Sequence, residues 1–181
     1  MIVGVLSDTH DRLDSLKGAV EVFKNNKVEL IVHCGDWVSP FTIEYFDFLC
    51  YDLKIPIYSV FGNNEGDIRR IIERNSKLKN PIIFTSKQTL EIQFNDKKVI
   101  VYHGQDSAIT KAVIKSQNYD AFFTGHTHVP INKVEYKTLV LNPGSTSYTA
   151  NSRIIDSASV AIYDSNTNSA NLFFLNKPLN I

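Results

Sequence analysis

Near its beginning the chain reads IVGVLSDTH (residues 2–10), in which five residues without polar side chains lead directly into Ser7, Asp8, Thr9 and His10. A short run of this kind, bounded by polar residues, is typical of a buried β-strand. When such strands lie parallel in an α/β sheet, the loops beyond their carboxyl ends meet in one crevice, where binding sites form. The stretch therefore predicts an α/β fold whose functional residues lie at strand ends.

Five further apolar runs end in the same way, in polar residues able to hold a metal ion. Four of the five histidines of the chain lie in these six loops. The further runs, each with the residues that follow it, are Leu30–Cys34 with Gly35-Asp36, Ile57–Phe61 with Gly62-Asn63-Asn64-Glu65, Val99–Tyr102 with His103-Gly104, Ala121–Phe123 with Thr124-Gly125-His126-Thr127-His128, and Leu139–Leu141 with Asn142-Pro143-Gly144-Ser145. The repetition indicates one site assembled from several strand ends.

Helices are expected mainly in the first half of the chain. Apolar residues recur at helical spacing from Leu13 to Phe23, and Asp11 is the expected N-cap of that segment. A second helix is expected to begin at Ser39-Pro40, because a capping residue followed by proline is a common helix start. Two more segments are expected to be helical, Asp67–Arg74 and, with a weaker pattern, Ser107–Ser116.

The second half of the chain favours hairpins, because apolar and polar residues alternate on both sides of short polar turns. The three expected hairpins pair Thr89–Phe94 with Lys98–Tyr102, Asn132–Tyr136 with Thr138–Leu141, and Ser159–Tyr163 with Ala170–Leu175. Residues 146–157 are expected to form a loop. No repeat or linker divides the chain, so the sequence predicts a single α/β domain over residues 1–181, with two sheets face to face and helices outside.

Composition narrows the classes of function. Nineteen basic residues balance nineteen acidic ones, so no overall field draws the chain to nucleic acid or to an anionic membrane. No apolar run is long enough to span a bilayer, and no secretory signal is recognisable. Cys34 and Cys50 are expected to be reduced and buried, which favours a cytoplasmic location. Tyr45, Tyr148 and Tyr163 are candidates for a homo-dimer or larger homo-oligomer surface, and core packing explains them equally well.

Seven side chains in the loops have the chemistry of metal ligands. They offer two carboxylates, one amide oxygen and four imidazoles, from Asp8, His10, Asp36, Asn63, His103, His126 and His128. This mixture suits manganese, iron, nickel, cobalt or zinc better than calcium or magnesium, which prefer shells of oxygen alone. Two ions close together need a shared ligand, and a carboxylate can give one oxygen to each. Spacing alone leaves open whether His126 and His128 bind one ion or two.

Each motif taken alone has a purely structural alternative. Asp8-Thr9-His10 is often a cap or a turn, and Gly35-Asp36 and Gly62-Asn63 are common in turns. His33, which belongs to no motif, is expected to be a structural histidine. Cys34 beside it is expected to be a buried thiol rather than a nucleophile. The conjunction of five ligand-bearing loops favours the metal site.

The motifs together resemble the five sequence blocks of the calcineurin-like metallophosphoesterases. The matching blocks are Asp8-x-His10, Gly35-Asp36, Gly62-Asn63-x-Glu65, His103-Gly104 and Gly125-His126-x-His128. The chain length and the Asn142-Pro143-Gly144-Ser145 run resemble the small YfcE-type phosphodiesterase group. The resemblance implies the metallophosphoesterase fold, a four-layer α/β/β/α sandwich of two mixed sheets flanked by helices.

The resemblance also implies the site and its cofactors. Two divalent ions are expected, manganese first, with nickel, iron(II), cobalt or zinc as alternatives. The ligands implied for the first ion are Asp8, His10, Asp36 and His128, and those for the second are Asp36, Asn63, His103 and His126. Asp36 would bridge the two ions. Asp36, Asn63 and Asn64 are the expected catalytic residues.

The reaction implied is hydrolysis of a small phosphodiester, and of monoesters as a further possibility. A hydroxide that bridges the ions would attack phosphorus in line, and the ions would neutralise charge on the phosphoryl oxygens. Asn63 and Asn64 would donate hydrogen bonds to the same oxygens. The chain would then be a hydrolase, releasing a phosphate monoester and an alcohol.

Many family members have a histidine at the position of Asn64. That histidine helps to protonate the leaving group or is oriented toward the phosphate. An amide cannot act as a general acid at neutral pH. Small YfcE-type members commonly lack this histidine, so the change does not indicate a dead enzyme. It predicts slow turnover of substrates with poor leaving groups, or a substrate that assists its own cleavage.

Two other functions compete with the phosphodiesterase. A retromer subunit looks like this group, has lost several ligands and acts by protein contacts, so a binding scaffold on the same fold is one alternative. All seven ligand positions are filled here, which favours the enzyme. A metal-dependent nuclease is the other, and the neutral charge and the lack of a basic, aromatic-rich groove weigh against a long nucleic acid as substrate.

Overall fold

The computed structural model describes residues 1–147, 149–150, 153–154 and 158–175, and its larger sheet is built around the first apolar run. This six-stranded sheet has the order β13-β12-β1-β2-β3-β4. Strands β1, β2, β3 and β4 are parallel to one another, and β12 and β13 are antiparallel to their neighbours. The strands span Ile2–Leu6 (β1), Leu30–His33 (β2), Ile57–Ser59 (β3), Ile83–Phe84 (β4), Ala158–Asp164 (β12) and Ser169–Leu175 (β13).

The second sheet has five strands in the order β5-β6-β7-β9-β8. Strands β6, β7 and β9 are parallel, and the two edge strands are antiparallel to their neighbours. The strands span Thr89–Phe94 (β5), Lys97–Tyr102 (β6), Ala121–Phe123 (β7), Ile131–Glu135 (β8) and Thr138–Asn142 (β9). The helices span Leu13–Asn25 (α1), Pro40–Cys50 (α2), Ile68–Asn75 (α3) and Ser107–Ser116 (α4).

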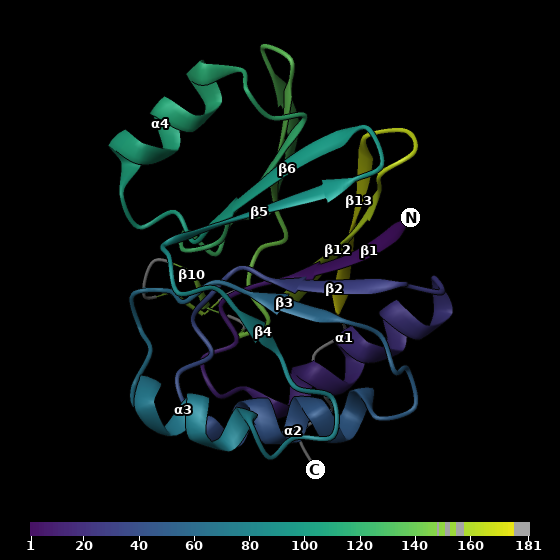
Figure 1. Cartoon of the computed structure of the whole chain (residues 1–181), viewed down its shortest axis with the longest axis vertical. Coiled ribbons are helices and arrows are strands. Elements are labelled where there is room, and N and C mark those ends of the chain that lie inside the picture. The colour runs from purple at the N-terminus through teal and green to yellow at the C-terminus, as the bar shows by residue number, and fades with distance from the viewer. Residues whose placement is uncertain (148, 151–152, 155–157, 176–181) are drawn as a thin grey trace.

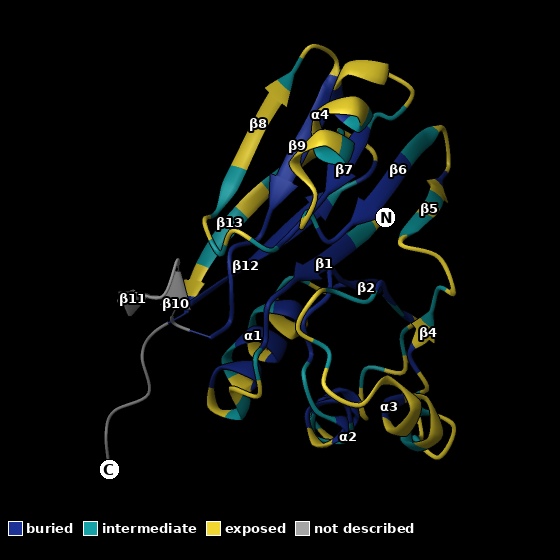
Figure 2. Ribbon diagram, turned by 90° about the vertical axis from the view of Figure 1, so that its left-hand side faces the viewer, coloured by how far each residue is buried: buried dark blue, intermediate teal, exposed yellow. Residues whose placement is uncertain are grey.

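The elements form four layers, which confirms the predicted α/β/β/α sandwich of two mixed sheets. Helices α1, α2 and α3 cover the outer face of the six-stranded sheet, and α4 covers the outer face of the other (Figure 1). Between the sheets, apolar side chains such as Val5 and Val32 pack against Val101 and Phe123. Figure 2 shows the central strands of both sheets largely buried and the edge strands β8 and β13 more exposed.

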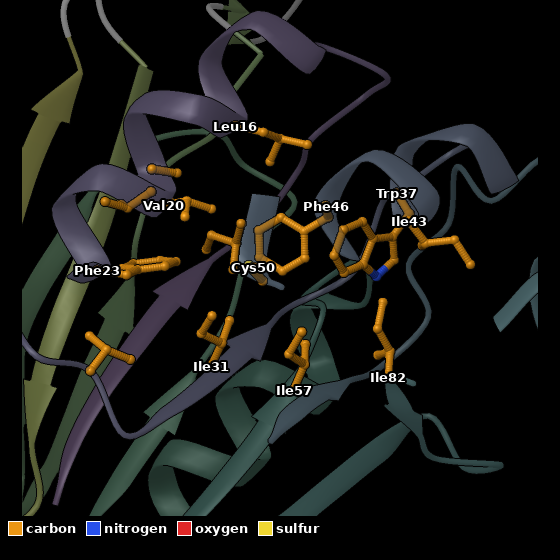
Figure 3. Packing of buried hydrophobic residues seen from close by; sticks show 14 of the residues in the cluster. Leu16, Val20, Phe23, Ile31, Trp37, Ile43, Phe46, Cys50, Ile57 and Ile82 are labelled. Carbon is orange, nitrogen blue, oxygen red and sulfur yellow. The ribbon is translucent and has the colours of Figure 1, made fainter. Parts of the chain in front are cut away.

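Apolar packing under α1 and α2 fixes the loops that follow the first strands. Trp37, which directly follows Asp36, is fully buried in this cluster, and its ring contacts Phe46 edge to face at a centroid distance of 5.4 Å (Figure 3). Its indole N–H donates a 2.9 Å hydrogen bond to Ser59 Oγ at the end of β3. The chain beyond β2 is therefore held against both α2 and β3.

The structure corrects the prediction that Asp11 caps the first helix. Arg12 occupies the N-cap position of α1 and makes no side-chain cap. Asp11 Oδ1 instead accepts hydrogen bonds from the backbone N–H of Ser39, at 3.0 Å, and from the Thr42 hydroxyl. It caps the start of α2, 28 residues away in sequence, because the loop after β1 lies beside that helix.

The predicted loop over residues 146–157 also needs correction. Two short strands lie within it, Thr149–Ala150 (β10) and Arg153–Ile154 (β11), and they pair antiparallel. Residues 148, 151–152 and 155–157 lie outside the described part of the chain. Strand β4, with only two residues, was not predicted either, because such a short edge strand carries no periodic pattern.

The aromatic residues considered for an oligomer surface divide between two environments. Tyr163 is fully buried between the sheets, which supports the core-packing alternative for that residue. Tyr45 is half-buried on α2 and packs against the cluster beneath it. Tyr148 lies outside the described residues. Both cysteines are free and buried, as predicted, and none of the helices in the described ranges could cross a membrane.

Candidate metal centre

The carboxyl ends of five strands bring the seven predicted ligands to one edge of the two sheets. Asp8 and His10 follow β1, Asp36 follows β2 and Asn63 follows β3. From the other sheet, His103 follows β6, and His126 and His128 follow β7. The parallel arrangement of β1, β2 and β3, and of β6 and β7, explains why these loops emerge on the same side.

Asp8, His10 and His128 form the first group of possible ligands. Asp8 Oδ1 lies 3.2 Å from His128 Nε2 and 3.9 Å from His10 Nε2. The two imidazole Nε2 atoms lie 3.2 Å apart. Asp36 Oδ2 approaches the same group, at 3.4 Å from His10 Nε2.

Asp8, Asp36 and His103 form the second group. His103 Nε2 lies 3.3 Å from Asp36 Oδ1 and 3.9 Å from Asp8 Oδ1. Asn63 Oδ1 lies 3.1 Å from His103 Nε2 and 2.8 Å from His126 Nδ1, so both remaining predicted ligands adjoin this group. Each carboxylate, Asp8 and Asp36, faces histidines of both groups.

These distances fit the chemistry of a divalent transition metal. Two ligand atoms that each lie about 2.1 Å from one ion are at most about 4.2 Å apart. The distances from the imidazole nitrogens to the other ligand atoms stated above for each group, between 3.2 and 3.9 Å, fall inside that limit. Both groups mix carboxylate oxygen with imidazole nitrogen, a set that suits manganese, iron, cobalt, nickel or zinc.

The electrostatics keep both carboxylates charged. Burial raises the pKa of Asp8, but hydrogen bonds to His10 and His128 and the nearby imidazoles outweigh it, so the pKa lies well below its usual range. Burial also raises the pKa of Asp36, and the interactions with His103 and Asn64 lower it to about 2. The site therefore presents two buried negative charges to a cation.

Five of the seven predicted ligands have backbone conformations that non-glycine residues rarely adopt. Their φ angles are 54° for Asp8, 45° for His10, 66° for Asp36, 65° for His126 and 59° for His128. Such conformations cost on the order of 1–3 kcal/mol each and persist only where the surrounding structure holds them. Here backbone hydrogen bonds join the loops, from Asp8 N to Gly35 O at 3.0 Å and from His10 N to Asp36 O at 3.2 Å.

Two glycines allow the loops to approach the carboxylates. A Cβ atom on Gly62 would collide with Asp36 Oδ1, and one on Gly125 would collide with Ser7 Oγ and lie 2.6 Å from Asp8 Oδ2. With Gly125 in place, the following N–H of His126 donates to Asp8 Oδ2 at 2.9 Å. Small residues beside the ligands therefore permit the close approach of the loops.

Glu65 organises the site from outside, a role that sequence reasoning did not assign. Its Oε1 accepts hydrogen bonds from the backbone N–H groups of Asp36, at 2.9 Å, and Gly62, at 3.0 Å. Its Oε2 accepts from those of Trp37, at 3.1 Å, and Val38, at 3.0 Å. One carboxylate thus ties the loop after β2 to the loop after β3. Its place in the block with Gly62 and Asn63 was the only signal in the sequence.

His33 and Cys34 lie behind the site. His33 Nδ1 accepts from the Gly35 N–H at 3.0 Å, which leaves Nε2 to donate to Thr9 Oγ1 at 2.8 Å. Its ring stacks on Trp37 at a centroid distance of 3.6 Å. Burial lowers its pKa to about 3. The structural role predicted for His33 is confirmed. Burial raises the pKa of the Cys34 thiol well above its usual range, which argues against a nucleophile.

Sequence comparison adds an independent observation to this geometry. The model of the calcineurin-like phosphoesterase superfamily domain matches residues 1–168. The chain belongs to this superfamily. It is therefore a metal-dependent phosphoesterase, as the resemblance in the ligand-bearing loops predicted.

Relatives of known name and structure agree with this assignment. "Phosphodiesterase MJ0936" of Methanocaldococcus jannaschii is 35% identical over 144 residues, which cover 80% of this chain and 83% of that protein. A solved archaeal phosphodiesterase superposes with a TM-score of 0.83 at 29% identity, covering 97% of this chain and 100% of the other. YfcE, a phosphoesterase from E. coli, gives a TM-score of 0.65 at 18% identity and equal coverage, which shows a shared fold.

Proposed function

We propose that this phosphoesterase hydrolyses small phosphodiesters with two divalent transition-metal ions. The observation that carries the proposal is the convergence of the seven side chains from five strand ends, at distances that suit two adjoining ions. The proposed first set is Asp8, His10, Asp36 and His128. The proposed second set is Asp36, Asn63, His103 and His126.

The two carboxylates are the candidates for the shared ligand. Asp36 uses different oxygens toward His10 and His103, at 3.4 and 3.3 Å, which supports it as the bridge. Asp8 also faces both histidine groups, but it approaches His10, His103 and His128 through the same oxygen, Oδ1, at 3.9, 3.9 and 3.2 Å. Asp36 therefore remains the preferred bridge.

When bound, the ions supply an activated water as nucleophile and positive charge for the phosphoryl oxygens. The protein supplies positions and hydrogen bonds. Asn63 and Asn64 are exposed at the mouth of the centre. Asn63 is the candidate to donate to a phosphate, whereas the side-chain amide of Asn64 donates to Asp36 Oδ2 at 2.9 Å. Manganese is the preferred ion, since imidazole-rich shells suit borderline metals, with nickel, iron(II), cobalt and zinc as alternatives.

The complete ligand set supports an enzyme over a binding scaffold, which has no need for two buried carboxylates beside four imidazoles. The balanced charge of the chain weighs against a nuclease that acts on long nucleic acids. The two free, buried cysteines support a cytoplasmic location as part of the proposal.

Metal removal tests the proposal. Dialysis against a chelator should abolish hydrolysis of bis(p-nitrophenyl) phosphate, and titration with manganese should restore it at two ions per chain. Metal content is measured by mass spectrometry alongside the rate. A chain that binds no metal on titration would point to the scaffold, and full activity after chelation would contradict the two-metal centre.

A further inference from the structure

A pocket of about 530 Å³ lies directly beside the candidate metal centre. Its walls come from the loop after β3, from α3, from β4 and the chain between β4 and β5, and from the loop after β6. Strand β4 lies between α3 and β5 in both ribbon views (Figures 1 and 2), so these segments surround one region of the surface.

The pocket and the metal centre share a wall. Gly62 lines the pocket, and its Cα is so close to Asp36 that an added Cβ would collide with Oδ1. Gln105 also lines the pocket, two residues after His103. A substituent on a phosphoryl group held at the metal centre would therefore lie close to the pocket.

Part of the lining is apolar and aromatic. Phe61 and Phe84 stack with their ring planes 4° apart and their centroids 4.6 Å apart. Ile68 and Ile72 on α3 also line the pocket, and they are 46% and 44% exposed. A flat apolar group that covered these four side chains would remove their surface from water, which is favourable.

The polar part of the lining indicates which flat group fits. Gln88 and Gln105 are exposed, and neither side chain has a hydrogen-bond partner among the described residues. An amide both donates and accepts, so it can bind the edge of a heteroaromatic ring. Lys87 is the one charged residue of the described lining, and its positive charge suits an anionic substrate. An aliphatic chain offers neither a donor nor an acceptor to these amides.

We infer that this pocket binds a planar heteroaromatic group, such as a nucleobase, carried by the phosphodiester. The inference rests on the proposed function, because it makes the pocket the specificity site of that reaction. It places the substrates among nucleoside phosphodiesters rather than among diesters of simple alcohols.

Two inhibitors that differ only by the base provide the first test. AMP and ribose 5-phosphate share the sugar phosphate, and both are measured against bis(p-nitrophenyl) phosphate hydrolysis. We expect AMP to inhibit at about tenfold lower concentration, within the range of one stacked base. Equal inhibition constants in an active enzyme would contradict binding of the base in the pocket and would leave the proposed function intact. Failure of hydrolysis with metal restored would instead count against the proposed function.

Two exposed isoleucines provide a variant and its matched control. Ile72 lines the pocket at 44% exposure, whereas Ile83 on β4 has 48% exposure and lies outside the lining. In Ile72→Ser we expect the ratio of the inhibition constants of ribose 5-phosphate and AMP to fall below about threefold. In Ile83→Ser this ratio should stay at the value of the parent. An unchanged preference in Ile72→Ser, or an equal loss in both variants, would overturn the inference.

Saturation-transfer NMR gives a readout that does not depend on turnover. With the manganese replaced by diamagnetic zinc, the H2 and H8 protons of AMP should receive saturation from the parent and from Ile83→Ser, and markedly less from Ile72→Ser. Saturation confined to the ribose protons would overturn the inference even if hydrolysis failed for other reasons.

Gln105 tests whether the pocket distinguishes a heteroaromatic ring from a plain one. We expect Gln105→Ala to weaken inhibition by AMP severalfold and to leave inhibition by phenyl phosphate unchanged, because a phenyl ring has no edge atoms for the amide to bind. Equal loss for both inhibitors would contradict recognition of ring heteroatoms.

Discussion

Asn64 donates hydrogen bonds to both carboxylate oxygens of Asp36, from its backbone N to Oδ1 at 2.8 Å and from its side-chain Nδ2 to Oδ2 at 2.9 Å. The sequence suggested that Asn64 contacts the substrate phosphate. In the structure its amide orients the proposed bridging ligand. Asn64 therefore influences the site through Asp36, because second-sphere hydrogen bonds fix how a carboxylate faces its ions.

Asp36→Asn should damage the enzyme more than Asn64→Ala. Loss of the shared negative charge would leave two cations repelling each other, so Asp36→Asn should lose metal and nearly all activity. Asn64→Ala keeps the backbone hydrogen bond to Oδ1 and should retain both ions, with a rate about tenfold lower. Metal content and bis(p-nitrophenyl) phosphate hydrolysis are measured on both. Comparable metal loss in the two variants would mean that Asp36 is not the bridge.

Asn64→His should matter most for substrates whose leaving group needs a proton. Nitrophenolate leaves without help, whereas a nucleoside alkoxide is strongly basic, and a general acid contributes about 10²–10⁴-fold to such steps. The exposed position of Asn64 leaves room for an imidazole. We expect faster hydrolysis of thymidylyl-thymidine and little change with bis(p-nitrophenyl) phosphate.

The control for this change is Asn64→Gln, which keeps an amide and should not alter the ratio of the two rates. The ratio is measured under one metal, with metal content determined in each variant. An Asn64→His enzyme with both ions and an unchanged ratio would show that position 64 does not mark a missing acid.

Glu65→Gln should loosen the centre without touching a ligand. Each carboxylate oxygen of Glu65 accepts hydrogen bonds from two backbone N–H groups. In glutamine one of these oxygens becomes an NH₂ group, which would face two donors in either orientation of the amide. Two hydrogen bonds to a charged group are lost, and we expect a free energy of unfolding lower by about 3 kcal/mol. Metal affinity should fall about 10–100-fold. Urea unfolding and metal titration measure the two effects.

Glu73→Gln is the matched control, because Glu73 is a solvent-exposed residue of α3 whose carboxylate accepts a hydrogen bond from Lys77. It should leave both unfolding and metal binding unchanged. If Glu65→Gln resembled Glu73→Gln, the four backbone hydrogen bonds would have no role in holding the loops.

His33 should make stability fall in mild acid. Burial lowers its folded pKa to about 3, whereas in the unfolded chain it is near 6.5. Below pH 6.5 the unfolded state therefore binds a proton that the folded state does not, and stability falls by up to about 1.4 kcal/mol per pH unit. Between pH 6.5 and 5 the contribution is about 2 kcal/mol.

The measurement compares the parent with His33→Gln by urea unfolding at several pH values in the presence of a chelator. The other histidines contribute equally to both proteins, so the difference in slope isolates His33. We expect a shallower pH dependence in His33→Gln. Parallel curves would show that His33 is not held in its neutral form by burial.

The sequence by itself determined the layers and the chemistry of the site. The apolar run at residues 2–6 and its five counterparts predicted buried strands, because only elements screened from water tolerate such runs. The ligand types at their ends predicted a transition-metal centre, because carboxylate and imidazole in one place suit those ions. Both inferences depend on residue type and local order, which a sequence records directly.

Only the tertiary structure decided the contacts that cross between loops. Asp11 caps α2 rather than α1, Glu65 binds the loop after β2, and Asn64 orients Asp36. Each of these joins residues that are 28 or 29 positions apart, so no local pattern reports it. The left-handed backbone of Asp8 and His128 is likewise imposed from outside, since nothing in their residue type favours it strongly enough. The packing of the two sheets sets these distances, and that packing depends on the whole chain.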